Sequence, residues 1–163
     1  MKTIGYVALA LLTVTWVTGC GSNSGTPESA GTPAASDSVA ESGEALAKEI
    51  LATFDEVVAE AAKLAEGKPE GATLRPQLEE LYATYEPKMA DLNVRYLKLS
   101  DAEPREFGNA NSYLGSNRGK HVTEKDNTLT EVVKYYNLEV GDKETVEVLT
   151  SGPVKLLEVA VKR

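Results

Sequence analysis

The residues best suited to chemistry lie together in the stretch 107–121, which reads FGNANSYLGSNRGKH. Arg118, Lys120 and His121 place three possible cations close together in a chain whose formal net charge is -8. An arginine can hold a carboxylate or phosphate through two parallel hydrogen bonds, and a histidine is a donor whose charge depends on pH. The candidate binding residues for a small anion are Asn111, Tyr113, Asn117, Arg118 and His121. The alternative is that Arg118 and His121 pair with acids of neighbouring helices and satisfy buried polar groups.

Few residues are available for metal binding or catalysis. His121 is the only histidine, and Glu124 lies three residues after it, whereas a zinc site needs three or four strong ligands. A haem held between Met89 and His121 would lack the C-x-x-C-H attachment motif. No G-x-S-x-G, P-loop or H-E-x-x-H motif is present. We therefore predict no catalytic residue, no metal ligand and no cofactor.

The charge of the chain argues against nucleic acid as a partner. It has 25 acidic residues against 17 lysines and arginines. Binding to nucleic acid depends on basic side chains that neutralise phosphates, so an acidic surface without a large basic patch disfavours it.

The first 20 residues have the composition of an export signal. Lys2 supplies a positive charge, and an apolar run follows over 4–17, which is too short to span a bilayer as a helix. The run ends in Val17-Thr18-Gly19-Cys20, which contains the only cysteine. This ending resembles the lipobox of bacterial lipoproteins. The resemblance implies that residues 1–19 are a signal peptide, that cleavage precedes Cys20, and that Cys20 carries lipid.

The lipobox resemblance also implies a location. Two or three acyl chains on Cys20 would anchor the protein almost permanently, because a single chain binds only marginally. Gly21 follows the cysteine, where lipoproteins kept in the inner membrane of Gram-negative bacteria commonly carry aspartate. We expect the outer membrane, facing the periplasm, in a Gram-negative cell and otherwise the outer face of the cytoplasmic membrane.

Two regions are expected after the lipid anchor. Residues 20–41 comprise the acylated cysteine and a linker of mostly Gly, Ser, Thr, Pro and Ala, which has too few apolar residues to fold. We predict that this linker is disordered. Residues 42–163 are enough for one domain with one core.

Apolar residues recur every three or four positions from Leu46 to Leu64 and predict an amphipathic helix. Ser42 can cap its start, and Gly67 and Pro69 should stop it. A second helix should follow, with Pro76 in its first turn. Pro87 should kink this helix or split it.

The residues of the middle region are compatible with more than one structure. Ser100 and Glu103 have the spacing of a capping box, which predicts a helix beginning near Ala102. The stretch 107–121 then has three interpretations. It is a helix in which a stripe of small residues lets another backbone approach, a loop in which glycines adopt positive φ, or a binding site. The stripe consists of Gly108, Ser112, Gly115 and Gly119, and the face beside it consists of Phe107, Asn111, Leu114, Arg118 and His121.

Helical spacing returns over 123–137, and the last segment has two interpretations. In the first, Asp142 caps a helix that Gly152 ends, and Pro153 starts another. In the second, the alternation over 138–148 and 157–161 forms a hairpin. Tyr135 and Tyr136 cannot both face one core, so one of them is expected to border a partner surface.

Together these patterns predict an all-α bundle of four or five helices after a disordered tether, with a small C-terminal hairpin in an α+β fold as the alternative. The expected function is that of a lipid-anchored cell-envelope lipoprotein. It would have a non-catalytic accessory role in which the helical surface engages another envelope protein. The alternative function is binding of a small anionic ligand or cell-wall fragment by the polar cluster at 111–121.

Overall fold

The computed structural model describes residues 41–163. The predicted signal peptide, the lipobox and nearly all of the linker lie outside the described residues. Within 41–163 the chain forms four α-helices and one π-helical turn, with no strand. The predicted all-α bundle is confirmed, and the hairpin alternative is wrong. The elements are α1 (Gly43–Leu64), α2 (Gly71–Ala102), α3 (Pro104–Lys134), η1 (Tyr135–Val140) and α4 (Lys143–Val161).

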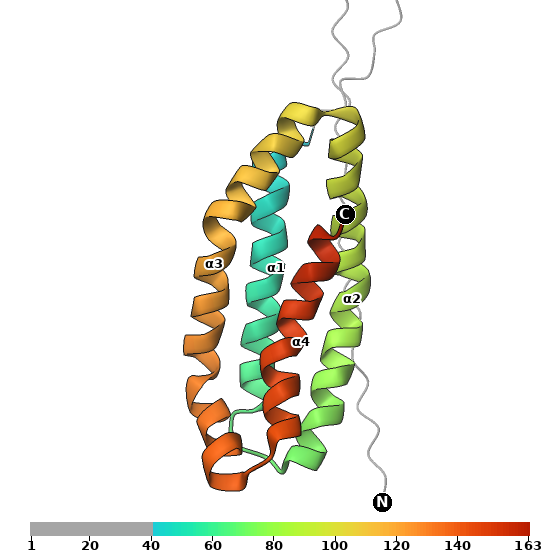
Figure 1. Cartoon of the computed structure of the whole chain (residues 1–163). Coiled ribbons are helices and arrows are strands. Elements are labelled where there is room, and N and C mark those ends of the chain that lie inside the picture. Colours follow the sequence, from blue (N-terminus) through green and yellow to red (C-terminus); the bar gives the residue numbers. More distant parts are fainter. Residues whose placement is uncertain (1–40) are drawn as a thin grey trace, which may run out of the picture. The chain divides into compact units, whose positions relative to one another are not determined.

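The helices alternate in direction along the chain (Figure 1). α1 packs mainly against α3 and α2, and α2 packs against α4. α3 and α4 are joined through η1 but share little contact along their lengths. α4 has 19 residues whereas α2 has 32, so α4 ends well before the connection between α2 and α3 (Figure 1). None of the helices in the described part of the chain is both long and apolar enough to cross a membrane.

α1 supplies much of the single core. Its predicted apolar stripe is buried, and Leu46, Ile50 and Phe54 are 0% exposed. Burial of such a side chain contributes roughly 1.5–3 kcal/mol. The predicted ends of α1 are also confirmed, because the Ser42 side chain accepts a hydrogen bond from the Ala45 N–H at the start and Gly67 adopts a φ of 82° in the turn after the helix.

α2 passes through two prolines without interruption. It begins at Gly71, five residues before Pro76, so Pro76 is not in the first turn, and Pro87 does not split the helix. A proline removes the hydrogen bond to the carbonyl four residues earlier. Those carbonyls belong to Ala72 and Ala83, which are exposed, so water can replace the lost hydrogen bonds.

The stretch 107–121 lies inside α3, so its interpretation as a loop is wrong. The close-packing interpretation is also wrong, because a Cβ added to Gly108, Gly115 or Gly119 would meet no atom within 4 Å. The glycines lie on the exposed side of the helix, and the residues of the adjacent face that begins at Phe107 are buried or half-buried. A helix begins close to the predicted start near Ala102, since α3 starts at Pro104, but Ser100 does not cap it because Ser100 lies within α2.

Close backbone contacts occur at other glycines. A Cβ on Gly43 would lie 1.8 Å from the Glu106 carbonyl oxygen, and one on Gly152 would lie 2.1 Å from the Tyr82 ring. The prediction that Gly152 ends a helix and Pro153 starts another is wrong, because α4 runs through both residues. The Tyr82 ring packs against Gly152.

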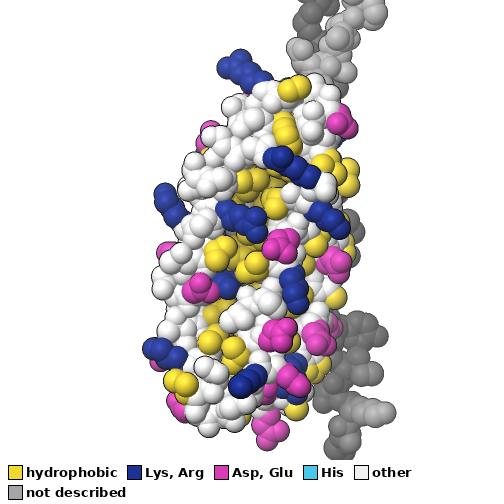
Figure 2. Space-filling view, in the orientation of Figure 1, with side chains coloured by type: hydrophobic (Ala, Val, Ile, Leu, Met, Phe, Trp, Pro, Cys, Tyr) yellow, Lys and Arg dark blue, Asp and Glu magenta, His cyan; other side chains and the backbone are white. Residues whose placement is uncertain are grey.

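Charged side chains are unevenly distributed over the face that carries α3 and α4 (Figure 2). Lysines and arginines surround an apolar area in the middle of this face. Aspartates and glutamates gather over the lower parts of α4 and α2. The face therefore has a basic part and an acidic part.

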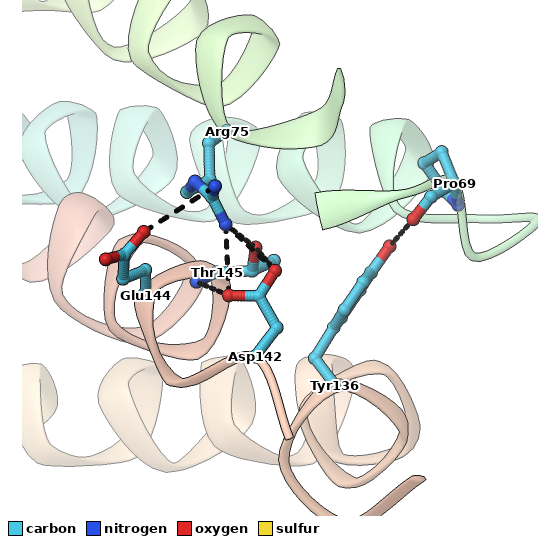
Figure 3. A network of polar contacts seen from close by, with 6 residues as sticks. All are labelled: Pro69, Arg75, Tyr136, Asp142, Glu144 and Thr145. Atoms are coloured by element: carbon cyan, nitrogen blue, oxygen red, sulfur yellow. Dashed lines mark hydrogen bonds and ion pairs between the residues drawn. The ribbon is translucent and has the colours of Figure 1, made fainter. Parts of the chain in front are cut away.

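A polar network closes the lower end of the bundle (Figure 3). The Arg75 guanidinium donates to both Asp142 carboxylate oxygens at 3.0 and 2.8 Å and to the Thr145 hydroxyl at 3.1 Å. Asp142 caps α4, as predicted, by accepting from the Thr145 N–H at 3.0 Å. The Tyr136 hydroxyl donates to the Pro69 carbonyl oxygen, which ties η1 to the turn between α1 and α2.

Candidate functional site

A groove of about 530 Å³ lies between α3 and the C-terminal end of α4, and we call it the α3/α4 groove. It forms where these two helices share little contact and α4 ends early. Two of the predicted site residues, Asn111 and Arg118, belong to it. The lining residues are Tyr96, Asn111, Leu114, Gly115, Arg118, Gly119, Val122, Val161 and Arg163.

Asn111 organises one end of the groove. Its side-chain oxygen accepts a hydrogen bond from the Tyr96 hydroxyl at 2.7 Å and another from the Arg163 guanidinium at 2.6 Å. Its amide nitrogen donates to the Phe107 carbonyl at 2.8 Å. The Arg163 guanidinium also lies over the Phe107 ring, 5.4 Å from the centroid. These contacts hold Arg163 in place before any ligand binds.

Arg118 has free hydrogen-bonding capacity. Its side chain is 39% exposed, and its nearest carboxylate in the described part of the chain is that of Glu158, at 3.9 Å. Glu158 is itself 62% exposed, so solvent weakens this ion pair. No hydrogen bond to another described residue occupies the guanidinium. Its planar set of N–H groups is therefore available to a carboxylate or phosphate.

The lining of the α3/α4 groove is basic although the whole chain is acidic. It includes two arginines and no aspartate or glutamate, whereas the chain has a formal net charge of -8. It also contains no histidine or cysteine, and its one tyrosine hydroxyl is committed to Asn111. The groove is thus equipped to hold an anion and lacks a group suited to act as a general base or nucleophile.

Two exposed glycines lower the wall of the groove on the α3 side. Gly115 and Gly119 both line it, and no atom lies within 4 Å of where their Cβ atoms would be. A glycine in a helix costs about 1 kcal/mol relative to alanine, and packing within the bundle does not require these two. Their effect is to let a ligand approach the helix backbone. Gly108 is equally open but lies outside the groove.

The other predicted site residues lie elsewhere on α3. The His121 Nδ1 atom lies 2.9 and 2.8 Å from the two carboxylate oxygens of Asp55 on α1. Lys48 of α1 places its Nζ atom 5.3 Å from the centroid of the Tyr113 ring. Asn117 donates to the Tyr113 carbonyl within the helix at 2.9 Å. The structure therefore unites Asn111 and Arg118 but does not bring these three residues into the groove.

No sequence pattern predicts that Tyr96 and Arg163 belong to the site. Arg163 lies 52 residues from Asn111 along the chain, and Tyr96 lies 15 residues before it on a different helix. Helical periodicity relates residues three or four positions apart, so no spacing rule connects these positions.

The described residues contain no group of three or more His, Cys, Asp or Glu side chains that could hold a metal ion. No protein-family model, curated protein or solved structure matches the chain. The α3/α4 groove is therefore interpreted from its own chemistry.

Proposed function

We propose that this chain is a lipid-anchored, non-catalytic binding protein of the cell envelope, and that the α3/α4 groove takes a carboxylate-bearing ligand. One observation supports this best. Within an acidic chain, a groove on the bundle surface is lined by two arginines and by no aspartate or glutamate side chain. Neither arginine is fully satisfied by a carboxylate of the described residues.

The two arginines would hold the ligand in different ways. Arg118 would donate two parallel hydrogen bonds to a carboxylate, which is the geometry that a guanidinium favours. Arg163 is already oriented by Asn111 and Phe107, so little conformational entropy is lost when it meets the ligand. Leu114, Val122 and Val161 would contact the carbon skeleton.

The size of the groove suits a small ligand. About 530 Å³ lies within the range of roughly 300–1,000 Å³ that is typical of small-molecule sites. Gly115 and Gly119 leave room beside the α3 backbone for an extended molecule. A short peptide that ends in a carboxylate, such as the stem of a cell-wall fragment, has the required charge and shape.

The location follows from the lipobox resemblance of Val17-Thr18-Gly19-Cys20. Lipid on Cys20 would hold the protein at a membrane surface, in the periplasm of a Gram-negative cell or outside the cytoplasmic membrane of another. Acidic lipid headgroups repel an acidic protein, so the covalent lipid would provide the attachment.

A thermal-melt screen of the full chain in neutral detergent tests the ligand. The compounds are muropeptides, simple dicarboxylates and inorganic phosphate, and unfolding is followed by circular dichroism. A compound at a hundred times its Kd adds about 2.7 kcal/mol of stability, which raises the Tm by several degrees. We expect one carboxylate-bearing compound to do so.

Two pairs of variants locate the effect. Arg118→Ala should abolish the shift, whereas Arg105→Ala, an exposed arginine of α3 outside the groove, should retain it. Gly115→Ala should reduce the shift by narrowing the groove, whereas Gly108→Ala should not. A flat screen, or an equal shift in Arg118→Ala, would overturn the proposal. A uniform response to every anion would show screening of surface charge instead of a site.

A further inference from the structure

α2 carries an exposed apolar stripe on a face that no other described element covers. The stripe contains two large side chains, Val94 at 65% and Leu97 at 38% exposure. Its members recur at alternating intervals of four and three, as do the residues of a coiled-coil seam. It extends for about 21 Å at 1.5 Å per residue. The α2 stripe consists of Ala83, Pro87, Ala90, Val94 and Leu97, all of them exposed.

The α2 stripe continues into a second groove, between α2 and α4. This α2/α4 groove has a volume of about 660 Å³, and Ala83 belongs to both the stripe and the groove. Tyr82, Val148 and Leu156 contribute an apolar surface to it. The Tyr82 ring packs against Gly152, and its hydroxyl donates to the Val148 carbonyl at 3.3 Å. The stripe and the groove meet at Ala83 and together form one track, apolar along the stripe and mixed in character within the groove.

Acidic side chains border this track. Glu79 and Glu86 of α2 and Glu144 and Glu147 of α4 line the α2/α4 groove. Two basic residues, Arg75 and Lys155, also line it, but Arg75 is held by Asp142 and Glu144 at 2.8 and 3.5 Å. Glu79, Glu86 and Glu147 form no ion pair with any residue in 41–163. Figure 2 shows acidic side chains gathered over this lower part of α2 and α4.

We infer that a cationic amphipathic helix of another protein docks along the α2 stripe and the α2/α4 groove. Apolar residues at heptad spacing would pack on the stripe, and lysines or arginines beside them would meet Glu79, Glu86 and Glu147. A second copy of the chain fits poorly, because it would bring the same carboxylates against each other. This surface differs from the α3/α4 groove, so the inference goes beyond the proposed function.

Two designed peptides of 21 residues test the charge and shape of the partner. One has leucines at the seam and lysines beside them, and its twin has glutamates in place of the lysines. Binding to the full chain in phosphatidylcholine nanodiscs is measured by fluorescence anisotropy, with empty nanodiscs as a blank. We expect the lysine peptide to bind at least about tenfold more tightly, a difference of about 1.4 kcal/mol. Equal binding of the two peptides would overturn the inference.

Matched variants locate the binding surface. Val94→Ser with Leu97→Ser should weaken binding of the lysine peptide about tenfold or more, because these are the two large exposed side chains of the stripe. Leu138→Ser with Val140→Ser removes comparable exposed residues from η1 and should change nothing. Equal loss in both pairs would show nonspecific adhesion and contradict the inference.

Charge reversal provides an independent check on the same surface. Glu86→Lys should weaken the lysine peptide, whereas Glu124→Lys on the exposed side of α3 should not. Arg118→Ala should leave peptide binding intact, so failure of this inference and failure of the proposed function are distinguishable. Sedimentation gives the remaining outcome, since a dimer that Val94→Ser with Leu97→Ser dissociates would show a second copy on the stripe and overturn the inference.

Discussion

The glycines of this bundle fall into two physical groups. Gly43, Gly71 and Gly152 lie where another element leaves no room for a Cβ, whereas Gly108 and Gly115 face open space. Close approach at the second group is one of three interpretations of the sequence, and it rests on the helical spacing of these residues. Spacing shows which residues share a helical face, but the direction of that face depends on packing against residues far away in the chain.

The two groups predict opposite effects of the same substitution. Gly152→Ala should lower the free energy of unfolding by about 1–3 kcal/mol, because the new methyl overlaps the Tyr82 ring. Gly108→Ala should raise it by about 0.5–1 kcal/mol through helix propensity alone. Urea unfolding of both variants measures the difference. Stabilisation by Gly152→Ala would mean that the Tyr82 ring moves aside without cost.

Asp142 links stability to pH. Hydrogen bonds from the Thr145 N–H and hydroxyl, together with the Arg75 guanidinium, hold the pKa of its carboxyl below the usual value. A lowered native pKa means that this contribution is complete above the unfolded-state pKa of about 4 and is lost as the pH falls through the native value.

Asp142→Asn should therefore keep the helix cap but lose the charge interaction with Arg75. We expect a loss of about 1 kcal/mol at pH 7, since asparagine caps helices as well as aspartate and the ion pair is only partly buried. The difference between variant and parent should shrink as the pH falls from about 4 to 2. A difference that stays constant over this interval would show that the charge of Asp142 contributes nothing. Chemical denaturation across this pH range provides the measurement.

Helical spacing predicts which residues are helical more accurately than it predicts where each helix ends. α1 matches its predicted cap, stripe and stop. α2 and α4 run through Pro87 and Pro153, which sequence rules treat as boundaries. α2 continues through Pro87 where Ala83, the residue that loses its hydrogen bond, is exposed, and α4 continues through Pro153 where the proline is buried. The sequence alone does not show whether either residue is exposed or buried. The sequence likewise suggests Asn111 and Arg118 as site residues. It does not predict that Tyr96 and Arg163 lie beside them, because these contacts depend on how the helices pack.

η1 is held to the turn between α1 and α2 by one hydroxyl. The Tyr136 ring is fully buried, and its hydroxyl donates to the Pro69 carbonyl. Burial raises the pKa of Tyr136, so the hydroxyl remains a donor over the neutral range. Tyr136→Phe keeps the ring and removes only this bond, which should cost about 1 kcal/mol in a thermal or urea melt. An unchanged melt would show that the contact adds no stability.

The two proposed binding surfaces of the bundle differ in charge and share α4 as a common wall. The α3/α4 groove is basic and the α2/α4 groove is mainly acidic, although both use α4. A net charge of -8 averages over this difference. The sequence shows the overall excess of acidic residues, but it does not show that the fold places basic and acidic side chains in separate grooves.

The proposed lipid anchor makes a prediction for the full chain. Cys20→Ser should move the protein from the membrane fraction to the soluble fraction, because the sulfur that would carry lipid is lost. The unfolding temperature of the domain should not change, since residues from Leu46 to Ala160 form the described core. Cell fractionation and a melt of both proteins test this. Retention of the variant in the membrane fraction would contradict lipid anchoring through this residue.

The early end of α4 makes the two ends of the bundle unequal in their resistance to opening. At the α2–α3 connection the described residues contribute three helices, α1, α2 and α3. Polar contacts join them around the buried residues there, among them the Glu106 carboxylate on the Gly43 N–H at 2.8 Å and Arg95 with Glu41 and Glu49. Ion pairs that are partly open to solvent, as those of Arg95 are, contribute little and weaken in salt. The η1 end is closed by a partly buried network instead. We therefore expect local unfolding to begin at the three-helix end and to become more frequent as ionic strength rises.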